Sequence, residues 1–260
     1  MITHIIVWIE IEHISLYVCN FSLKCIASFL KLWYIYSILN RIGVYKMGRE
    51  NKKEAVAALH REQIMKAAEK LFSEKGYEQT TIEDISKASE YSRRTIYAYY
   101  ESKEDILHHI VEKGLIELKN DIENAINLNE DFITVYKAIC AAMSKYQSEY
   151  HHSADNVNST NAANFDFKNL SDTVKHILLL GTEINTILAA FIENGKKKGI
   201  VRQDIIPMLT VYILWSSIAS FLTLAQTKGQ FISKQFSISE NEFLDYGFKQ
   251  LINSILEVRI

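Results

Sequence analysis

Two adjacent arginines and three tyrosines lie close together in the stretch SRRTIYAYYESKED, residues 92–105. A guanidinium group can donate two parallel hydrogen bonds to O6 and N7 of guanine, while lysine side chains and the free N–H groups of a helix N-terminus can bind phosphate. Paired arginines also occur on solvated helix faces. The stretch therefore has the chemistry to bind a nucleic acid, provided that the surrounding elements present it outwards.

Four helices are predicted around this stretch. Apolar residues spaced at i, i+3, i+4, i+7 and i+8 predict an amphipathic helix over 60–76 that ends at a glycine. Two overlapping candidate capping boxes, Thr80-x-x-Glu83 and Thr81-x-x-Asp84, predict the start of a short second helix. Ser92 caps a third helix that runs through residue 99, and a further capping box starts a long helix over 102–126.

Two short helices joined by a tight turn and braced by a longer helix form a helix-turn-helix, whose second helix offers its N-terminal residues to the major groove. In this arrangement Arg93 and Arg94 face outwards, and Lys103 binds a phosphate together with the start of the fourth helix. Residues 92–103 hold three basic residues and one acidic residue, whereas residues 81–103 hold four of each. Local position rather than net charge would therefore supply the attraction for DNA.

The stretch AAEKLFSEKGYEQTTIEDISKASEYSRRTIYAYYESKEDIL resembles the DNA-binding half of TetR/AcrR-type transcriptional repressors, most specifically in GYEQTTIEDI and TIYAYYESKEDIL. Downstream, IENGKKKGIVRQD at 192–204 resembles the segment that leads into the dimerisation helices of that family. The resemblance implies a homodimer that binds a double-stranded DNA operator and is released when a small apolar molecule enters its C-terminal domain. The positions that it implies for DNA contact are Thr81, Ser92, Arg93, Arg94, Thr95, Tyr97, Tyr100 and Lys103.

Three features of this stretch remain open or depart from the family pattern. Tyr97 and Tyr100 either contact DNA or pack in the three-helix core. Glu90 stands where the family usually has glycine in the turn, and Ser89 stands where it usually has alanine. Because a non-glycine residue in a left-handed conformation costs about 1 kcal/mol, we predict a strained or reshaped turn there.

The predicted fold class is all-α. It comprises an N-terminal three-helix helix-turn-helix DNA-binding domain over 47–105 and a C-terminal helical ligand-binding and dimerisation domain over 106–260. Further helices are predicted over 131–150, 176–198, 205–227 and 241–258, with a polar loop over 151–172, with or without a short helix, that would gate a ligand pocket. The last two helices of each copy would form a four-helix dimer interface.

Aromatic and flexible apolar side chains in the C-terminal part suggest where a ligand would bind. Such side chains belong more often to a core than to a pocket, but pockets for small molecules are lined by the same residue types. The predicted ligand-binding residues are Tyr136, Met143, Phe191 and Trp215.

Residues 1–46 differ in composition from the rest of the chain. They are rich in Ile, Leu, Tyr, Trp and Phe and give way abruptly to the charged stretch MGRENKKEAVAALHREQ. We predict that Met47 is the native start and that residues 1–46 are a non-native extension translated from upstream. The alternative is a real extension that binds a membrane or a partner, although Lys24 and Lys31 would each cost roughly 2.5 to 3.5 kcal/mol near a bilayer centre.

Composition limits the classes of function. A net charge of −2 and a pI near 6.5 exclude a strongly basic coat for nucleic acid. Three cysteines without metal-ligand spacing predict a reducing compartment, the cytoplasm, with no disulfide and no structural metal. The sequence has no glycine-rich phosphate loop or nucleophile elbow, so we expect neither an enzyme nor a cofactor.

Two other classes of function stay open. Residues 205–227 carry no charge and are long enough to span a bilayer. Pro207 in the first turn and scattered Ser and Thr residues favour a helix covered by its own domain and by a twin subunit, so no stable membrane insertion is expected. The alternatives are a membrane-associated helical sensor, with 1–46 or 205–227 inserted, and a helical interaction protein that does not bind DNA.

Overall fold

The computed structural model describes residues 52–128, 130–158 and 170–258. The predictions for residues 1–46 and for a start at Met47 lie outside these ranges. The chain divides into two compact units, Met1–Arg61 and Glu62–Ile260. In the first unit the described residues, 52–61, are helical.

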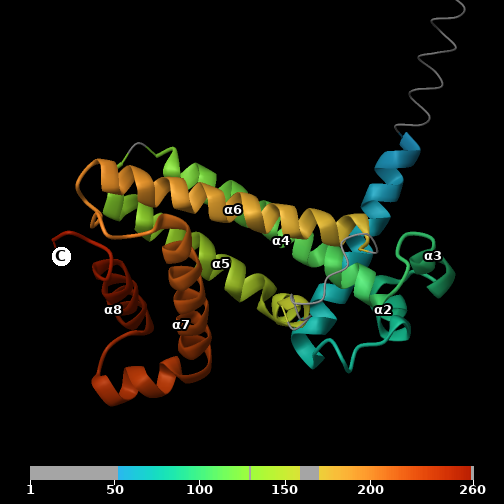
Figure 1. The fold of residues 1–260 in the computed structure, drawn as a ribbon. Coiled ribbons are helices and arrows are strands. Elements are labelled where there is room, and N and C mark those ends of the chain that lie inside the picture. The colour runs from blue at the N-terminus through green and yellow to red at the C-terminus, as the bar shows by residue number, and fades with distance from the viewer. Residues whose placement is uncertain (1–51, 129, 159–169, 259–260) are drawn as a thin grey trace, which may run out of the picture. The chain divides into compact units, whose positions relative to one another are not determined.

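The second unit is built from helices (Figure 1). Its described part contains no β-strand, only an isolated antiparallel bridge between Val201 and Leu256, and this confirms the all-α fold class. A helical segment at 62–75 is followed by α2 (Ile82–Ser89), α3 (Arg93–Tyr97), α4 (Lys103–Ile126), α5 (Phe132–Asn158), α6 (Asp172–Lys197), α7 (Pro207–Phe236) and α8 (Glu240–Asn253).

The helices of the helix-turn-helix begin at the predicted caps. The Thr81 hydroxyl accepts a hydrogen bond from the Asp84 N–H at 3.2 Å, and the Asp84 carboxylate accepts one from the Thr81 N–H at 2.9 Å. Ser92 and Ser102 cap α3 and α4 in the same way, by accepting hydrogen bonds from the backbone N–H three residues further on. Side-chain oxygens thus satisfy N–H groups that have no partner within the helix.

Two hydrophobic cores lie within the second unit. The first joins the 62–75 segment, α2, α3 and the beginning of α4 through Ile64, Phe72, Ile85 and Ile96, which are all fully buried. The second core lies among α4, α5, α6, α7 and α8. Because α4 contributes side chains to both cores, no linker separates the helix-turn-helix from the helices that follow. The predicted division at 105/106 falls inside α4.

Several helix boundaries differ from those predicted. The backbone is helical through Asn158, so the first part of the predicted loop at 151–172 belongs to α5, and most of its remainder lies outside the described residues. The next difference is in α7, which continues past residue 227 to Phe236. Conversely, α8 ends at Asn253, because the chain then turns back: the Arg202 N–H donates to the Ile255 carbonyl and the Glu257 N–H to the Ile200 carbonyl.

By length and composition, α6 and α7 would each be able to cross a membrane. Core helices of soluble proteins pass the same test, so this finding is weak evidence for a span. In the most apolar window of α7 only 22% of the residues are buried. Much of the apolar surface of α7 therefore faces away from its own unit.

Candidate DNA-binding surface and effector cavity

Helix α3 is the second helix of the helix-turn-helix and is therefore the candidate recognition helix. It presents both arginines to solvent. Arg93 is 64% exposed in its side chain, and its guanidinium group lies 3.5 Å from a carboxylate oxygen of Glu83. Arg94 is exposed too, and within the described residues no carboxylate lies within ion-pair distance of it. Tyr97 is 55% exposed, whereas Ile96 is fully buried and anchors the helix. The outward orientation predicted for Arg93, Arg94 and Tyr97 is thus found.

The predicted hydroxyl contacts lie at helix ends. Ser92 is exposed, its Oγ lies 2.8 Å from the Thr95 Oγ1, and it accepts the Thr95 N–H at 3.1 Å. Thr81 is exposed at the start of α2, where its hydroxyl donates to Asp84 at 2.6 Å. These hydroxyls hold the helices at the surface that would meet DNA, and their contact with DNA stays a prediction.

Tyr100 departs from the DNA-contact prediction. Its side chain is only 3% exposed and belongs to the first core, where its ring packs edge-on against His109 with 5.4 Å between the centroids. The chain leaves α3 in a tight turn in which the Tyr100 N–H donates to the Ile96 carbonyl. This turn directs the ring inwards, so Tyr100 takes the core role that the sequence left open.

Lys103 has partners within the protein that the sequence did not predict, and its contact with a phosphate stays a prediction. Its ammonium group donates hydrogen bonds to the carbonyl oxygens of Tyr77 at 2.8 Å and Thr80 at 3.0 Å. The same nitrogen lies 4.1 Å from the centroid of the Tyr77 ring, a cation–π contact. Lys103 therefore braces the turn before α2 against the start of α4.

The turn between α2 and α3 has the predicted left-handed residue. Glu90 has φ 61° and ψ 14°, a conformation that favours glycine. Two serines stabilise the turn: the Ser86 hydroxyl donates to the Tyr91 carbonyl at 2.6 Å, and the Ser89 hydroxyl accepts from the Tyr91 N–H at 3.4 Å. Ser89, in a position where alanine is usual in the family, thus supplies a hydrogen bond that alanine lacks.

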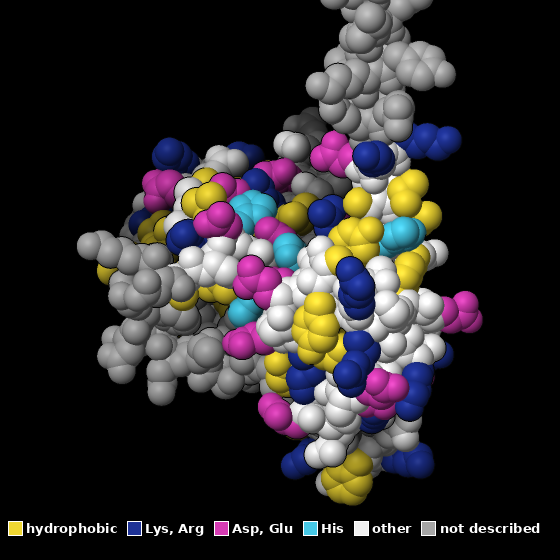
Figure 2. Space-filling view, turned by 90° about the vertical axis from the view of Figure 1, so that its right-hand side faces the viewer, with side chains coloured by type: hydrophobic (Ala, Val, Ile, Leu, Met, Phe, Trp, Pro, Cys, Tyr) yellow, Lys and Arg dark blue, Asp and Glu magenta, His cyan; other side chains and the backbone are white. Residues whose placement is uncertain are grey.

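Positive charge on this side of the molecule is local. Figure 2 shows Lys and Arg side chains interspersed with Asp and Glu side chains, without one continuous basic surface. Among the exposed acidic residues, Glu83 pairs with Arg93, and Glu90 lies in the turn before α3. Attraction for DNA would therefore depend on where the two guanidinium groups stand, as the charge count of residues 92–103 indicated.

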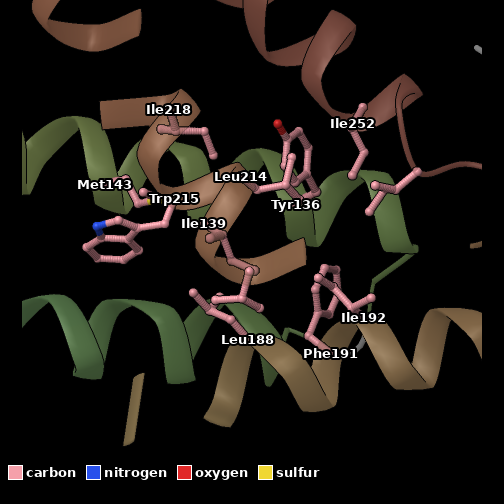
Figure 3. Close-up of a pocket in the computed structure, with 12 residues that line it drawn as sticks. Tyr136, Ile139, Met143, Leu188, Phe191, Ile192, Leu214, Trp215, Ile218 and Ile252 are labelled. Atoms are coloured by element: carbon pink, nitrogen blue, oxygen red, sulfur yellow. The ribbon is translucent and has the colours of Figure 1, made fainter. Parts of the chain in front are cut away.

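An apolar cavity of about 40 Å³ lies among α5, α6, α7 and α8. All four predicted ligand-binding residues line it, and Figure 3 shows Met143 and Trp215 towards one end and Phe191 towards the other. The remaining lining residues were not predicted, because aliphatic residues that face a cavity have the same sequence pattern as those that face a core. They are Ile139, Leu188, Ile192, Val211, Leu214, Ile218, Ile252 and Ile255.

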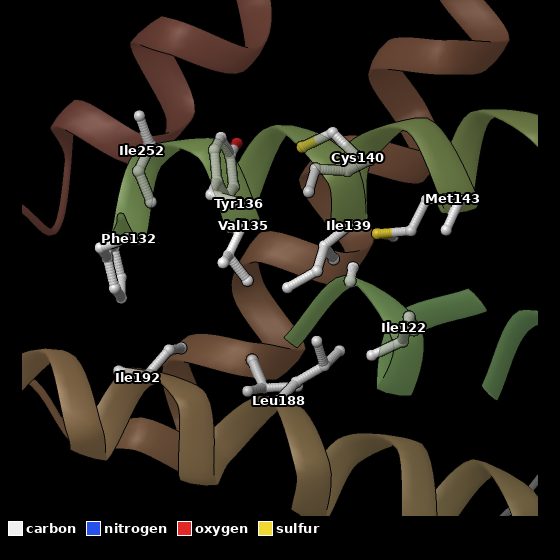
Figure 4. Packing of buried hydrophobic residues seen from close by; sticks show 14 of the residues in the cluster. Ile122, Phe132, Val135, Tyr136, Ile139, Cys140, Met143, Leu188, Ile192 and Ile252 are labelled. Atoms are coloured by element: carbon white, nitrogen blue, oxygen red, sulfur yellow. The ribbon is translucent and has the colours of Figure 1, made fainter. Parts of the chain in front are cut away.

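The polar groups near the cavity are uncharged. The Tyr136 hydroxyl donates to the Phe248 carbonyl on α8 at 3.0 Å, and burial raises the pKa of this tyrosine well above its usual range. Burial likewise raises the pKa of the Cys140 thiol to about 12. Figure 4 shows both side chains on α5 among aliphatic neighbours. The cavity therefore suits an uncharged apolar group, because a buried charge without a partner would be costly.

The described residues contain no group of histidine, cysteine and carboxylate side chains that would hold a metal ion. The capped helices and the outward arginines define a helix-turn-helix, an arrangement that DNA-binding proteins use.

Comparison with known proteins finds similarity to one family of regulators. Residues 64–110 match the family model for bacterial regulatory proteins of the tetR family. The negative transcriptional regulator IcaR of the biofilm operon icaADBC of Staphylococcus epidermidis is 29% identical over 118 residues, which are 38% of this chain and 64% of IcaR. The chain thus spans less than two thirds of that relative. The HTH-type transcriptional repressor KstR2 of Rhodococcus jostii is 28% identical over 156 residues, 56% of this chain and 69% of KstR2. These matches show that the chain is similar to transcriptional regulators of the TetR family, most directly over residues 64–110.

Solved structures support the fold. The transcriptional regulator FadR from Bacillus subtilis, in complex with stearoyl-CoA, superimposes with a TM-score of 0.56 at 18% identity. The superposition covers 74% of this chain and 98% of FadR. At this identity the likeness shows a shared fold alone.

Proposed function

We propose that this chain is a ligand-responsive repressor that binds a double-stranded DNA operator as a homodimer in the cytoplasm and is released by a small apolar molecule. The observation that carries the proposal is the exposed pair Arg93 and Arg94 at the capped start of the second helix of a helix-turn-helix. Guanidinium groups at this position can reach guanine in the major groove. The word repressor in the names of relatives such as KstR2 supports the direction of control.

The proposed dimer would form through α7. Four large apolar side chains in its first two turns are exposed, namely Met208, Leu209, Tyr212 and Ile213, and Leu224 and Phe231 are exposed further along. Ser216 and Ser220 lie on the exposed side between these two groups, where small side chains allow a second helix to approach closely. Burial of such a surface against a twin copy would stabilise a symmetric dimer.

The apolar side of α8 packs within its own subunit. Gly247 lies against the Phe221 ring of α7, which occupies the space that a Cβ on Gly247 would need, and Leu244 and Leu251 pack against the second core. On α8, Tyr246 is the large apolar side chain that remains exposed, at 63%. In the proposed interface α7 therefore supplies most of the apolar surface, and α8 packs against α7.

The proposed effector would enter the cavity lined by Tyr136, Met143, Phe191 and Trp215. Pockets for small molecules usually measure about 300–1,000 Å³. A cavity of about 40 Å³ must therefore expand before it holds more than a small group. Its uncharged lining favours an apolar molecule or an apolar chain. The stearoyl-CoA complex of the structurally similar FadR supports an acyl chain as one such effector.

The proposed mechanism is geometric. Two recognition helices of a dimer must match half-sites about 34–36 Å apart, one turn of DNA. A ligand that binds better to a conformation with a different separation shifts the population away from DNA binding. No chemical step is required.

The test is a titration of the full chain against the DNA upstream of its own gene, followed by fluorescence anisotropy. We expect saturable binding that exceeds binding to random DNA of the same length, and we expect Arg93→Ala/Arg94→Ala to remove the difference. A chain that binds neither DNA, while remaining folded, would favour the interaction-protein alternative. Recovery of the native protein in the membrane fraction would favour the membrane-associated sensor, an alternative that the apolar α7 keeps open.

A further inference from the structure

One face of α5 connects the cavity with the core of the helix-turn-helix. Tyr150 is only 4% exposed and lies in the first core with Ile64 and Ile110, although most of its helix packs in the second core. Tyr146 packs against both cores. Met143 lines the cavity. Residues 143, 146 and 150 follow at helical spacing, so one continuous row of side chains runs from the cavity to the DNA-binding core.

Gly114 on α4 receives this row of side chains. A Cβ at this position would lie 2.8 Å from the Tyr150 Cγ and 3.0 Å from the Tyr146 Cε2, both closer than carbon atoms normally approach. Only glycine therefore lets both rings lie against the α4 backbone. The Tyr150 hydroxyl also donates a hydrogen bond of 2.9 Å to Glu117, three residues further along α4.

We propose that Tyr146 and Tyr150, seated on Gly114, are positioning residues that transmit occupancy of the cavity to the recognition helix. This inference depends on the proposed function. A ligand too large for a cavity of about 40 Å³ must displace side chains that line it, and Met143 is one of these lining residues. Because Met143 and the two tyrosines belong to one rigid helix, displacement of α5 moves both rings. Protein interiors are closely packed, so the helices around Tyr150 must move with it.

A large side chain tethered in the cavity provides a test without a known ligand. Leu214→Trp overfills the cavity from α7. We compare this substitution in the full-length wild type, in Gly114→Ala and in Gly181→Ala. Gly181→Ala is the matched control, because Gly181 also lies within a helix but nothing lies within 4 Å of its added Cβ.

The first readout is binding to the DNA upstream of the gene. In the wild type and in Gly181→Ala we expect Leu214→Trp to weaken binding roughly tenfold, inside the 5- to 150-fold range typical of allosteric coupling. In Gly114→Ala, where the rings no longer sit on α4, we expect a change of less than about twofold. If Leu214→Trp weakens DNA binding equally in all three backgrounds, the proposal is overturned. It is also overturned if Leu214→Trp does not weaken DNA binding in the wild type.

The second readout is amide hydrogen exchange of residues 82–97, which requires no DNA. We expect Leu214→Trp to change this exchange in the wild type and in Gly181→Ala, but not in Gly114→Ala; the same change in all three overturns the proposal. If the wild type fails to bind DNA, the proposed function fails, and hydrogen exchange still decides the coupling. Tyr146→Ala removes one of the two rings at a half-buried position, so it replaces Gly114→Ala if that variant does not fold.

Discussion

The ammonium group of Lys103 lies 4.1 Å from the centre of the Tyr77 ring and donates a hydrogen bond of 2.8 Å to the Tyr77 carbonyl oxygen. Lys103 is the first residue of α4, and Tyr77 lies in the turn that precedes α2. A second hydrogen bond, to the Thr80 carbonyl, holds the residue just before the α2 cap. One side chain thus sets the position of α2 relative to α4.

Lys103→Met should therefore destabilise the protein. It retains much of the length of the side chain but leaves two carbonyl groups without a charged donor, so we expect the free energy of unfolding to fall by about 1–3 kcal/mol. Chemical denaturation measures this change, with Lys70→Met as the control because the Lys70 side chain is 75% exposed. Unchanged stability, together with a salt slope of DNA binding reduced by about one, would instead identify Lys103 as a phosphate contact.

Glu90→Gly should stabilise the helix-turn-helix. Glu90 has a positive φ, and a left-handed residue with a Cβ costs about 1–2 kcal/mol, so we expect a gain of about 1 kcal/mol in the free energy of unfolding. Glu90→Ala removes the carboxylate but retains the Cβ. A similar gain in both variants would attribute the effect to charge rather than to the backbone.

The sequence predicted what depends on local chemistry. The capping residues Thr81, Ser92 and Ser102 each bind the backbone within one turn of their helix, so the helix starts were readable. The partners of Lys103 and Tyr100 within the protein were not predicted, because packing brings them together from different elements. The carbonyl that Lys103 binds at Tyr77 lies 26 residues away.

Of the residues that line the cavity, the sequence predicted only the aromatic residues and the methionine. Tyr136 and Trp215 stand out in a sequence, but Leu188 and Leu214 do not, because a leucine that faces a cavity has the same helical spacing as one that faces a core. The connection of Tyr150 to Gly114 was hidden for a different reason. It depends on how closely α4 and α5 approach, and a single glycine in a helix does not indicate which ring will cover it.

Arg94→Ala should reduce discrimination between operator and random DNA. The Arg94 guanidinium has no ion-pair partner among the described side chains and is free to bind a base, so we expect a loss of about 1–3 kcal/mol on the operator and relaxed choice at one base pair. Arg93→Ala is the comparison, because Arg93 already lies 3.5 Å from Glu83. Equal losses for Arg94→Ala on operator and random DNA would exclude base reading by Arg94.

Asp84 should make stability depend on pH in acid. Hydrogen bonds from the Lys75 ammonium and from the Thr81 side chain and backbone lower the pKa of Asp84 below its ordinary value of 3.8. Because the folded-state pKa is the lower one, this stabilisation is present above the ordinary pKa and is lost as pH falls through the folded-state pKa. We expect Asp84→Asn to unfold more readily than the wild type at pH 7 and the difference to shrink below pH about 4. Urea denaturation across this range, with exposed Glu78→Gln as the control, measures the difference, and a gap that persists at low pH would contradict it.

Ile213→Asp should separate the proposed dimer. Ile213 is 65% exposed beside Tyr212, which is 55% exposed, so a carboxylate there has little effect on a monomer but would be buried without a partner between two copies of α7. We expect analytical ultracentrifugation to show a dimer for the wild type and for Thr182→Asp, a control on an exposed position of α6, and a monomer for Ile213→Asp. Because two recognition helices must engage two half-sites together, the monomer should also bind operator DNA far more weakly. A dimer that survives Ile213→Asp would place the interface elsewhere, and unfolding of the variant would show that Ile213 supports its own subunit.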